Sequence, residues 1–187
     1  PKGDIIIADT GNNGGARKQL MLHFVKEPKP GATSAKLLRT LRVHYADQKG
    51  ASPDYDCEAV FCAAGRIYLL TKRQSDGRTY LYRVDGDSTA KSNPLRLVDT
   101  FDIGGTVTAS DVSPDGRLVA VLTYTALWVF EFDAKAGRIR WGSGRKLPIF
   151  AWQAEALAFD GNAGVVIGNE GGQLYRVPLA DLPAARP

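Results

Sequence analysis

The chain has 187 residues, 44% of them hydrophobic and 24% charged, which is the composition of an ordinary soluble globular protein. This length suffices for one domain with its own hydrophobic core, or for part of a larger domain. The formal charge of +4 comes from Lys and Arg residues spread along the chain rather than clustered, which argues against a nucleic-acid-binding protein.

Short apolar runs alternate with clusters of Gly, Asp, Asn and Pro from the beginning of the sequence. Helical periodicity is nearly absent, so this alternation predicts an all-β protein. Before residue 50, the runs rich in Ile, Leu and Val predict strands over 4–8, 19–25 and 37–45. No run is long enough for a membrane-spanning helix, and no signal-peptide pattern is present.

After residue 50 this alternation of apolar runs and turn residues occurs three more times, with tight turns such as that at 113–116. Strands are predicted over 57–62, 66–71, 79–84 and 95–103, then over 108–112, 118–122, 127–132 and 146–152, and finally over 154–160, 165–168 and 173–179. Glu58, Asp111 and Glu155 each stand near the start of a unit and are 53 and 44 residues apart. This period is close to the length of a β-propeller blade, which has four antiparallel strands.

The sequence therefore predicts a single β-propeller domain over 1–179, with repeat units 1–45, 56–103, 106–152 and 154–179 and a C-terminal tail over 180–187. The second strand of each unit is an unbroken apolar run, as expected for a strand covered on both faces. A β-sandwich is the alternative fold. The first unit lacks its innermost strand and the last unit its outermost one. This leaves either a compact four-bladed ring or, the reading we favour because the chain opens abruptly in a strand, a fragment of a longer propeller.

Acidic residues stand where the strands of each unit begin or end. In an antiparallel hairpin the start of the first strand lies beside the end of the second. If the units are arranged radially, these positions share one end of the central channel. We therefore expect a single acid-rich rim formed by Asp9, Glu58, Asp111, Glu155 and Glu170, with Lys72 and Tyr124 among them.

Several carboxylates held close together need a cation, an internal Lys or Arg, or raised pKa values. Oxygen-rich clusters suit Ca²⁺ or Mg²⁺ better than zinc, so the five acids are candidate calcium ligands. The alternative is that each acid accepts backbone hydrogen bonds at a strand end and is well solvated. The loop at 9–15 does not match an EF-hand but keeps Asn13 as a candidate ligand contact, and Arg17 is a candidate counter-ion or anion ligand.

The cysteine, histidine and tryptophan residues are predicted to have structural roles. Cys57 and Cys62 are interpreted as two free thiols. They are five positions apart, which places them on opposite faces of an extended strand, and no further ligands have metal-site spacing. His23 and His44 fall on outer strands. The three tryptophans, Trp128, Trp141 and Trp152, are interpreted as packing residues between blades. No motif of classical hydrolases or nucleotide-binding proteins occurs.

The order of several motifs resembles a known family. ADTGNN at 8–13 followed by Arg17, DYDCEAV at 54–60, LLTK at 69–72, VTASDVSPDGRLVAVLTYT at 107–125, AEALAF at 154–159 and NEGGQLYRVP at 169–178 are similar to the bacterial propeller proteins grouped as phytase-like or esterase-like. The resemblance spans nearly the whole chain. It implies a β-propeller and an exported, periplasmic or extracellular, protein; most members have no characterised function.

Together these observations predict a propeller whose acidic rim binds a small phosphorylated or ester ligand through a divalent cation, for which Ca²⁺ is the candidate. If the protein is an enzyme, metal-assisted hydrolysis of a phosphate or other ester is the expected reaction, with Glu58 or Glu170 orienting the attacking water. Substrate contacts are expected from Lys72, Arg17, Tyr124 and Asn13. The alternative is a non-catalytic propeller whose rim binds a protein or peptide.

Overall fold

The protein is built almost entirely from β-strands in the structure, a computed structural model that describes residues 3–17, 19–73 and 75–184. Its helices within these residues are two short 3₁₀ turns, Pro53–Tyr55 (η1) and Leu179–Asp181 (η2). The predicted all-β class is confirmed. No helix in the described residues is long and apolar enough to cross a membrane.

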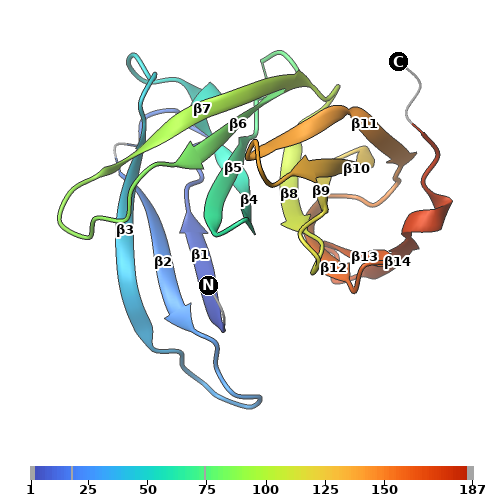
Figure 1. Ribbon diagram of the computed structural model, residues 1–187, viewed down its shortest axis with the longest axis horizontal. Coiled ribbons are helices and arrows are strands. Elements are labelled where there is room, and N and C mark those ends of the chain that lie inside the picture. Colours follow the sequence, from blue (N-terminus) through green and yellow to red (C-terminus); the bar gives the residue numbers. More distant parts are fainter. Residues whose placement is uncertain (1–2, 18, 74, 185–187) are drawn as a thin grey trace.

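The strands form three sheets that follow one another along an open arch (Figure 1). The first sheet has seven strands in the order β1-β2-β3-β7-β6-β5-β4, namely β1 (Asp4–Asp9), β2 (Leu20–Lys26), β3 (Leu37–Tyr45), β4 (Cys57–Ala63), β5 (Arg66–Thr71), β6 (Arg78–Val84) and β7 (Asn93–Asp102). The second has four strands in the order β11-β10-β9-β8, namely β8 (Val107–Val112), β9 (Leu118–Thr123), β10 (Ala126–Asp133) and β11 (Arg138–Pro148). The third is β12 (Ala154–Asp160), β13 (Gly164–Asn169) and β14 (Leu174–Pro178).

Two groups of four consecutive strands pair antiparallel, β4 to β7 and β8 to β11. The β1–β3 group joins the first of these through a short parallel pairing of β3 with β7, which runs from Val43 opposite Asn93 to Tyr45 opposite Leu95. Strands of the first two predicted units thus share one sheet, while those of the third and fourth units form sheets of their own. The arrangement of these groups as propeller blades stays a prediction.

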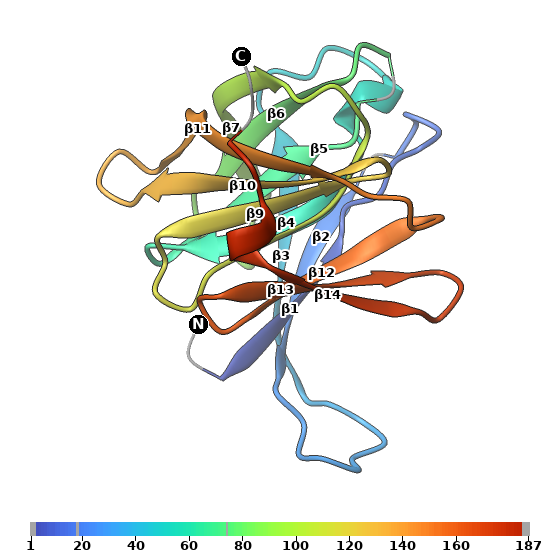
Figure 2. The same ribbon diagram turned by 90° about the vertical axis from the view of Figure 1, so that its right-hand side faces the viewer.

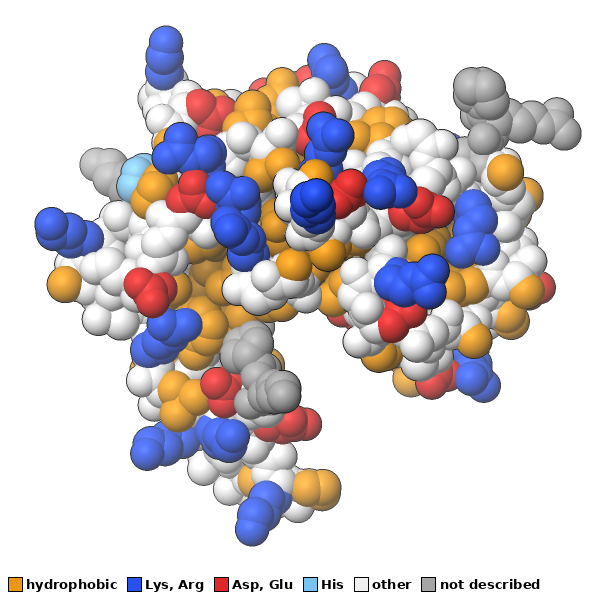
Figure 3. All heavy atoms as spheres, viewed as in Figure 1, with side chains coloured by type: hydrophobic (Ala, Val, Ile, Leu, Met, Phe, Trp, Pro, Cys, Tyr) orange, Lys and Arg blue, Asp and Glu red, His pale blue; other side chains and the backbone are white. Residues whose placement is uncertain are grey.

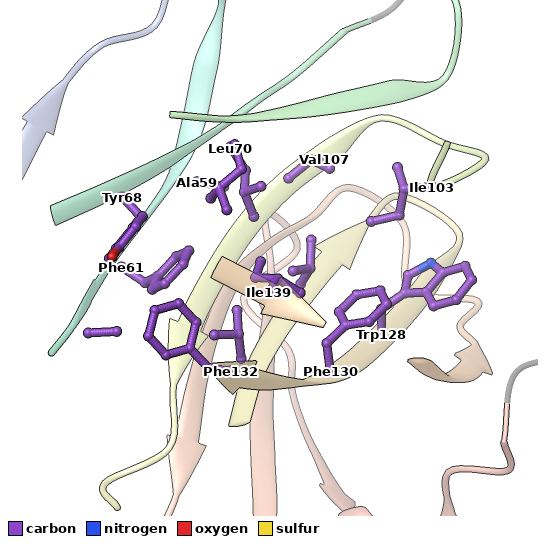
Figure 4. Close-up of a cluster of buried hydrophobic side chains, with 14 of the residues drawn as sticks. Ala59, Phe61, Tyr68, Leu70, Ile103, Val107, Trp128, Phe130, Phe132 and Ile139 are labelled. Carbon is purple, nitrogen blue, oxygen red and sulfur yellow. The ribbon is translucent and has the colours of Figure 1, made fainter. Parts of the chain in front are cut away.

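An aromatic core fills the space between the β4–β7 group and the β8–β11 sheet (Figure 4). Phe61 stacks on Tyr68 with ring centroids 5.1 Å apart, and Phe132 meets both rings edge-on. Farther along the same layer, Phe101 and Trp141 stack at 4.7 Å beside the fully buried Phe130. These large rings bury much apolar area and fix how the two groups pack.

Two further cores cover the rest of the arch. Leu22, Leu41 and Val43 of the β1–β3 group pack against Leu69 and Tyr82 of the β4–β7 group. On the other side, aliphatic residues of the β8–β11 sheet face those of β12 and β13. The second strand of each full unit is buried along most of its length, as the unbroken apolar runs predict.

Three details differ from the sequence-based expectations. Strand β11 already begins at Arg138, because the segment after the turn pairs with β10 across a bulge. Trp152 is 69% exposed, so its predicted packing role is wrong, whereas Trp128 and Trp141 do pack between strand groups. The predicted tail is partly structured: Lys146 donates its backbone N–H to the carbonyl of Pro183, and Leu182 is buried. Residues 185–187 of that tail lie outside the described residues.

Candidate functional site

A β-bulge occurs at the second residue of β4, β8 and β12. In β4 the partners jump from Cys57–Thr71 to Ala59–Leu70, which leaves Glu58 as the extra residue. The same shift skips Thr108 in β8 and Glu155 in β12. Bulges re-aim a side chain out of the regular alternation. The structurally equivalent positions are therefore Glu58, Thr108 and Glu155.

The sequence-based alignment of Asp111 with Glu58 and Glu155 is corrected by this register. Asp111 lies three residues beyond the bulge of β8, opposite Ala120 of β9. Its carboxylate accepts the backbone N–H groups of Val112 and Phe159, both at 2.8 Å, and so ties β8 to β12. It also lines a separate surface cavity with Asp4 and Cys62. Asp111 has the structural role that the alternative interpretation gave to such acids.

The second strand of each unit ends beside the bulge and is followed by Lys72, Tyr124 or Glu170. The backbone N–H of Lys72 bonds to the carbonyl of Asp56, just before β4. The N–H of Glu170 bonds in the same way to Gln153, just before β12. These pairings place Lys72 and Glu170 beside the bulged ends of β4 and β12. Tyr124 directly follows β9, whose last residue, Thr123, pairs with Val107 at the bulged end of β8.

Four of the predicted site residues form one connected network. The Lys72 ammonium lies 2.7 Å from Glu58 Oε2 and 5.5 Å from the centre of the Tyr124 ring. The Tyr124 hydroxyl donates a 2.6 Å hydrogen bond to Glu155 Oε1. The network extends from β4 to β12 and crosses the two junctions on either side of the β8–β11 sheet.

The two central members of the network have shifted pKa values. Burial acts to lower the pKa of Lys72, but its hydrogen bonds with Glu58 and Tyr124 outweigh that effect, so the pKa is raised. The pKa of Tyr124 is raised first by burial and then by its hydrogen bond to Glu155. Lys72 is therefore a firmly protonated cation, and it balances the Glu58 charge without any metal ion.

Glu155 and Glu170 also share a surface cavity of about 430 Å³, which Asn169, Gln173 and Leu174 line as well. The Asn169 and Gln173 amides bond to each other at 3.0 Å. Glu170 is exposed, and no hydrogen bond or ion pair of its side chain is present among the described residues. This cavity brings two of the predicted acids to a common space.

Asp9 and Arg17 form a separate ion pair in the loop after β1. Arg17 also donates to the Gly11 carbonyl at 3.1 Å, and its pairing lowers the pKa of Asp9. The loop is fastened to the start of β4 because Thr10 donates to the Cys57 carbonyl at 2.9 Å. Asn13 is exposed in this loop. The Asp9–Arg17 pair thus supports the counter-ion role predicted for Arg17.

Asp56 is a residue that the sequence did not single out as part of a site. It is 1% exposed; one carboxylate oxygen accepts the Asn12 N–H, and the other has no partner among the described residues. The Tyr45 hydroxyl is likewise buried without a partner among the described residues, and burial raises the pKa of Tyr45, with a smaller contribution from the Asp56 charge. The available sequence signal is an Asp that immediately precedes the apolar run 57–62.

The five acids do not form one cluster. Within residues 3–17, 19–73 and 75–184, no three His, Cys, Asp or Glu side chains come together in a group that could hold a metal ion. Glu58 is paired with Lys72, Asp9 with Arg17, and Asp111 with backbone amides. Of the predicted ligands, Glu155 and Glu170 line one cavity. Calcium binding stays a prediction.

The other chemically reactive residues are accounted for locally. Cys57 and Cys62 are free thiols, and burial raises the pKa of Cys57 to about 12, which makes it an unreactive thiol at neutral pH. His23 hydrogen-bonds to Thr40 of β3, and His44 hydrogen-bonds to Ser92 just before β7. Lys, Arg and acidic side chains are intermixed over the face seen in Figure 3.

Comparison with known proteins gives no family. No protein-family model and no curated protein matches the chain. Among solved structures it is similar to Sqt1 from Chaetomium thermophilum, with 14% identity and a TM-score of 0.48 over 92% of this chain and 40% of that one. A Carbohydrate-Active Enzymes Family AA12 protein from Trichoderma reesei gives 11% identity and 0.47 over 68% and 37%. A functionally unknown protein from Desulfotomaculum acetoxidans gives 12% and 0.44 over 98% and 60%.

This chain spans less than two thirds of the length of each of these three structures. The identities and TM-scores are too low for any of the three to carry a conclusion about this chain.

Proposed function

We propose that the strand groups of this chain are blades of a β-propeller, and that the rim carrying Glu155 and Glu170 binds a small polar ligand. Three features support the arrangement. Strands β4 and β8 lie side by side, as do β8 and β12. A bulge stands at the same place in all three. Two groups have the four antiparallel strands of a blade.

The observation that carries the ligand proposal is the cavity of about 430 Å³ shared by Glu155 and Glu170. A concave space with convergent polar groups is the usual form of a small-ligand site. Glu155 is fixed there by Tyr124, while Glu170 is free to contact a ligand. A phosphorylated or ester ligand would reach this cavity together with a divalent cation, for which Ca²⁺ suits the oxygen donors.

The chemistry proposed for this site is metal-assisted ester hydrolysis. A cation bound by the two carboxylates would supply the polarisation of the ester oxygen. Glu170 is the better candidate to orient the attacking water, because Lys72 already holds Glu58. Lys72 keeps Glu58 in position, and Tyr124 keeps Glu155 in position. The resemblance to phytase-like and esterase-like propellers agrees with this reaction and with export of the protein.

A thermal melt with Ca²⁺ and with chelator tests the ligand proposal. Calcium at about 100 times its Kd stabilises a folded protein by about 2.7 kcal/mol. For a chain of this size we expect the Tm to rise by about 5 °C or more. Glu170→Gln and Glu155→Gln should each remove that rise. Glu131→Gln, at an exposed ion pair on β10, is the matched control and should keep it.

Hydrolysis of p-nitrophenyl phosphate and p-nitrophenyl acetate, with the same variants, then tests catalysis. An unchanged Tm with Ca²⁺ and chelator, or an equal rise in the Glu170→Gln and Glu155→Gln proteins, would refute the cation site. Calcium binding without hydrolysis would leave a binding protein.

A non-catalytic interaction propeller is the second candidate, since large apolar side chains are exposed beside the rim. Phe150 is fully exposed, Trp152 is 69% exposed and Leu174 is 77% exposed. Exposed apolar groups of this size mark interaction sites more often than chance. Binding of a peptide library that is insensitive to chelator and lost in Trp152→Ser would favour this candidate.

A further inference from the structure

The end of the hairpin that joins β2 to β3 projects from the body of the molecule. We call its residues, 26–39, the arm. Figure 1 and Figure 2 both show the arm reaching past the ends of the other strands. The pairing of β1 with β2 goes no farther than Asp4 opposite Lys26, so the loop 27–36 lies beyond it. Every residue of the arm is exposed to solvent.

The arm has a defined backbone conformation. The backbone N–H of Lys26 donates to the Lys36 carbonyl at 2.8 Å, which continues the pairing of the two strands. At the tip, the Ala32 N–H donates to the Lys29 carbonyl at 3.0 Å across Gly31, whose φ of +81° suits a glycine. Two prolines in the loop restrict it further. A segment that is already ordered loses less conformational entropy when it binds a partner.

A bulge and an aromatic contact lie at the base of the arm. Between Phe24 and Val25 of β2 the register with β3 shifts by one residue, which leaves Leu38 as the extra residue. Bulges bend a strand, and the arm leaves the body at this one. The Arg39 guanidinium lies over the Phe24 ring, 4.2 Å from its centre. This contact fixes the direction of one positive charge at the surface.

The arm carries most of the net charge of the protein. Four of its residues are basic and one is acidic, so it contributes three of the four net positive charges of the chain; these residues are Lys26, Lys29, Lys36, Arg39 and Glu27. Lys26 lies 3.7 Å from Asp4, and the other three basic side chains have no ion pair among the described residues. Figure 3 shows Lys and Arg side chains along this projection. Like charges held close together repel one another, and an acidic partner would relieve that repulsion.

We propose that the arm is a docking site for an acidic segment of a partner protein. Leu37 and Leu38 are 56% and 44% exposed beside the charges, so the surface fits a polypeptide that has both acidic and apolar residues. The loop 27–36 has no large apolar side chain to enter a membrane, and the arm has no aromatic ring on which a base could stack. This inference depends neither on the cation site nor on the propeller arrangement.

Fluorescence anisotropy with the whole chain and a fluorescein-labelled peptide of Glu, Leu and Ser tests the proposal. The peptide should bind, more weakly as salt is added, and a peptide with Gln in place of Glu should not bind. Combining Lys29→Glu with Lys36→Glu should weaken binding about tenfold, because two attractions become repulsions. Lys135→Glu combined with Arg138→Glu makes the same change in net charge at the exposed turn between β10 and β11, and should keep most of the affinity.

Removing the arm gives a second test. Replacing residues 27–36 by Asn-Gly, a tight hairpin turn, should abolish peptide binding and leave the Tm nearly unchanged, because the removed residues are all exposed. Vesicles of phosphatidylserine and phosphatidylcholine and a single-stranded RNA oligonucleotide are the comparison probes. The proposal would be overturned by equal losses in the arm and control variants, by unchanged affinity without the arm, or by binding of vesicles or RNA in place of the peptide.

Discussion

The two junctions on either side of the β8–β11 sheet have different cores. Toward β4–β7 the core is aromatic, with Phe61, Phe132, Phe130 and Trp128. Toward β12–β14 it consists mainly of small aliphatic residues such as Ala120, Ala154 and Val165. Both junctions nevertheless bring the first strands of neighbouring groups together, β4 beside β8 and β8 beside β12. Each junction also carries one contact of the network that runs from Glu58 to Glu155. The position of the rim thus depends on the strand arrangement rather than on the kind of core beneath it.

The aromatic junction should dominate the stability of the domain. Phe130 is fully buried, and Phe130→Ala is expected to lower the free energy of unfolding by about 3–5 kcal/mol, because it removes a large ring and leaves a cavity. Urea denaturation measures the loss. Phe150→Ala, which removes the same ring from a fully exposed position, should have almost no effect. Equal losses of unfolding free energy in Phe130→Ala and Phe150→Ala would contradict the dominant role of the aromatic core.

Truncating a buried side chain should cost somewhat less stability in the aliphatic junction than in the aromatic junction. Ile167 is 1% exposed in β13, and Ile167→Ala is expected to cost about 2–5 kcal/mol, toward the lower end because the small neighbours can close in. Hydrogen exchange should then show faster exchange in β12–β14 than in β4–β11. Leu97→Ala is the control. A uniform increase in exchange would contradict the idea of two separable junctions.

The Lys72–Glu58 ion pair, which lies within the β4–β5 hairpin beside the aromatic junction, can be tested by its charge. Lys72→Met should cost about 1–2 kcal/mol at neutral pH, reduced from the full value of a charged hydrogen bond because Glu58 is partly exposed. The pKa of Lys72 is raised above 10.5, so its contribution is complete below that pH and is lost as the pH rises through the folded-state pKa. Wild type and variant should therefore become equally stable at high pH. Lys26→Met, at an exposed ion pair, should show almost no such difference.

The smallest effect is expected from the link across the aliphatic junction. Tyr124→Phe removes the hydrogen bond to Glu155 and should cost about 0.5–1.5 kcal/mol in thermal or urea unfolding. Combining it with Glu155→Gln in a double-mutant cycle should show that the two losses are not additive. Strict additivity would mean that the bond contributes nothing in solution.

Local sequence determined the strands and their grouping. The run 66–71 and the run 154–160 became strands with those same limits, and the turn at 113–116 lies between β8 and β9 as predicted. These features depend on alternation, apolar content and turn residues that are close together in the chain, so a single sequence contains them.

Only the tertiary structure decided which residues share the rim. The bulges at Glu58, Thr108 and Glu155 are shifts of register between two strands, and composition does not mark them. For this reason the spacing of the acids aligns Asp111 with the wrong position and does not mark Thr108. Lys72 meets Glu58 within one hairpin and Tyr124 meets Glu155 across two sheets. Such pairings depend on how the sheets pack, because packing fixes which distant side chains face each other.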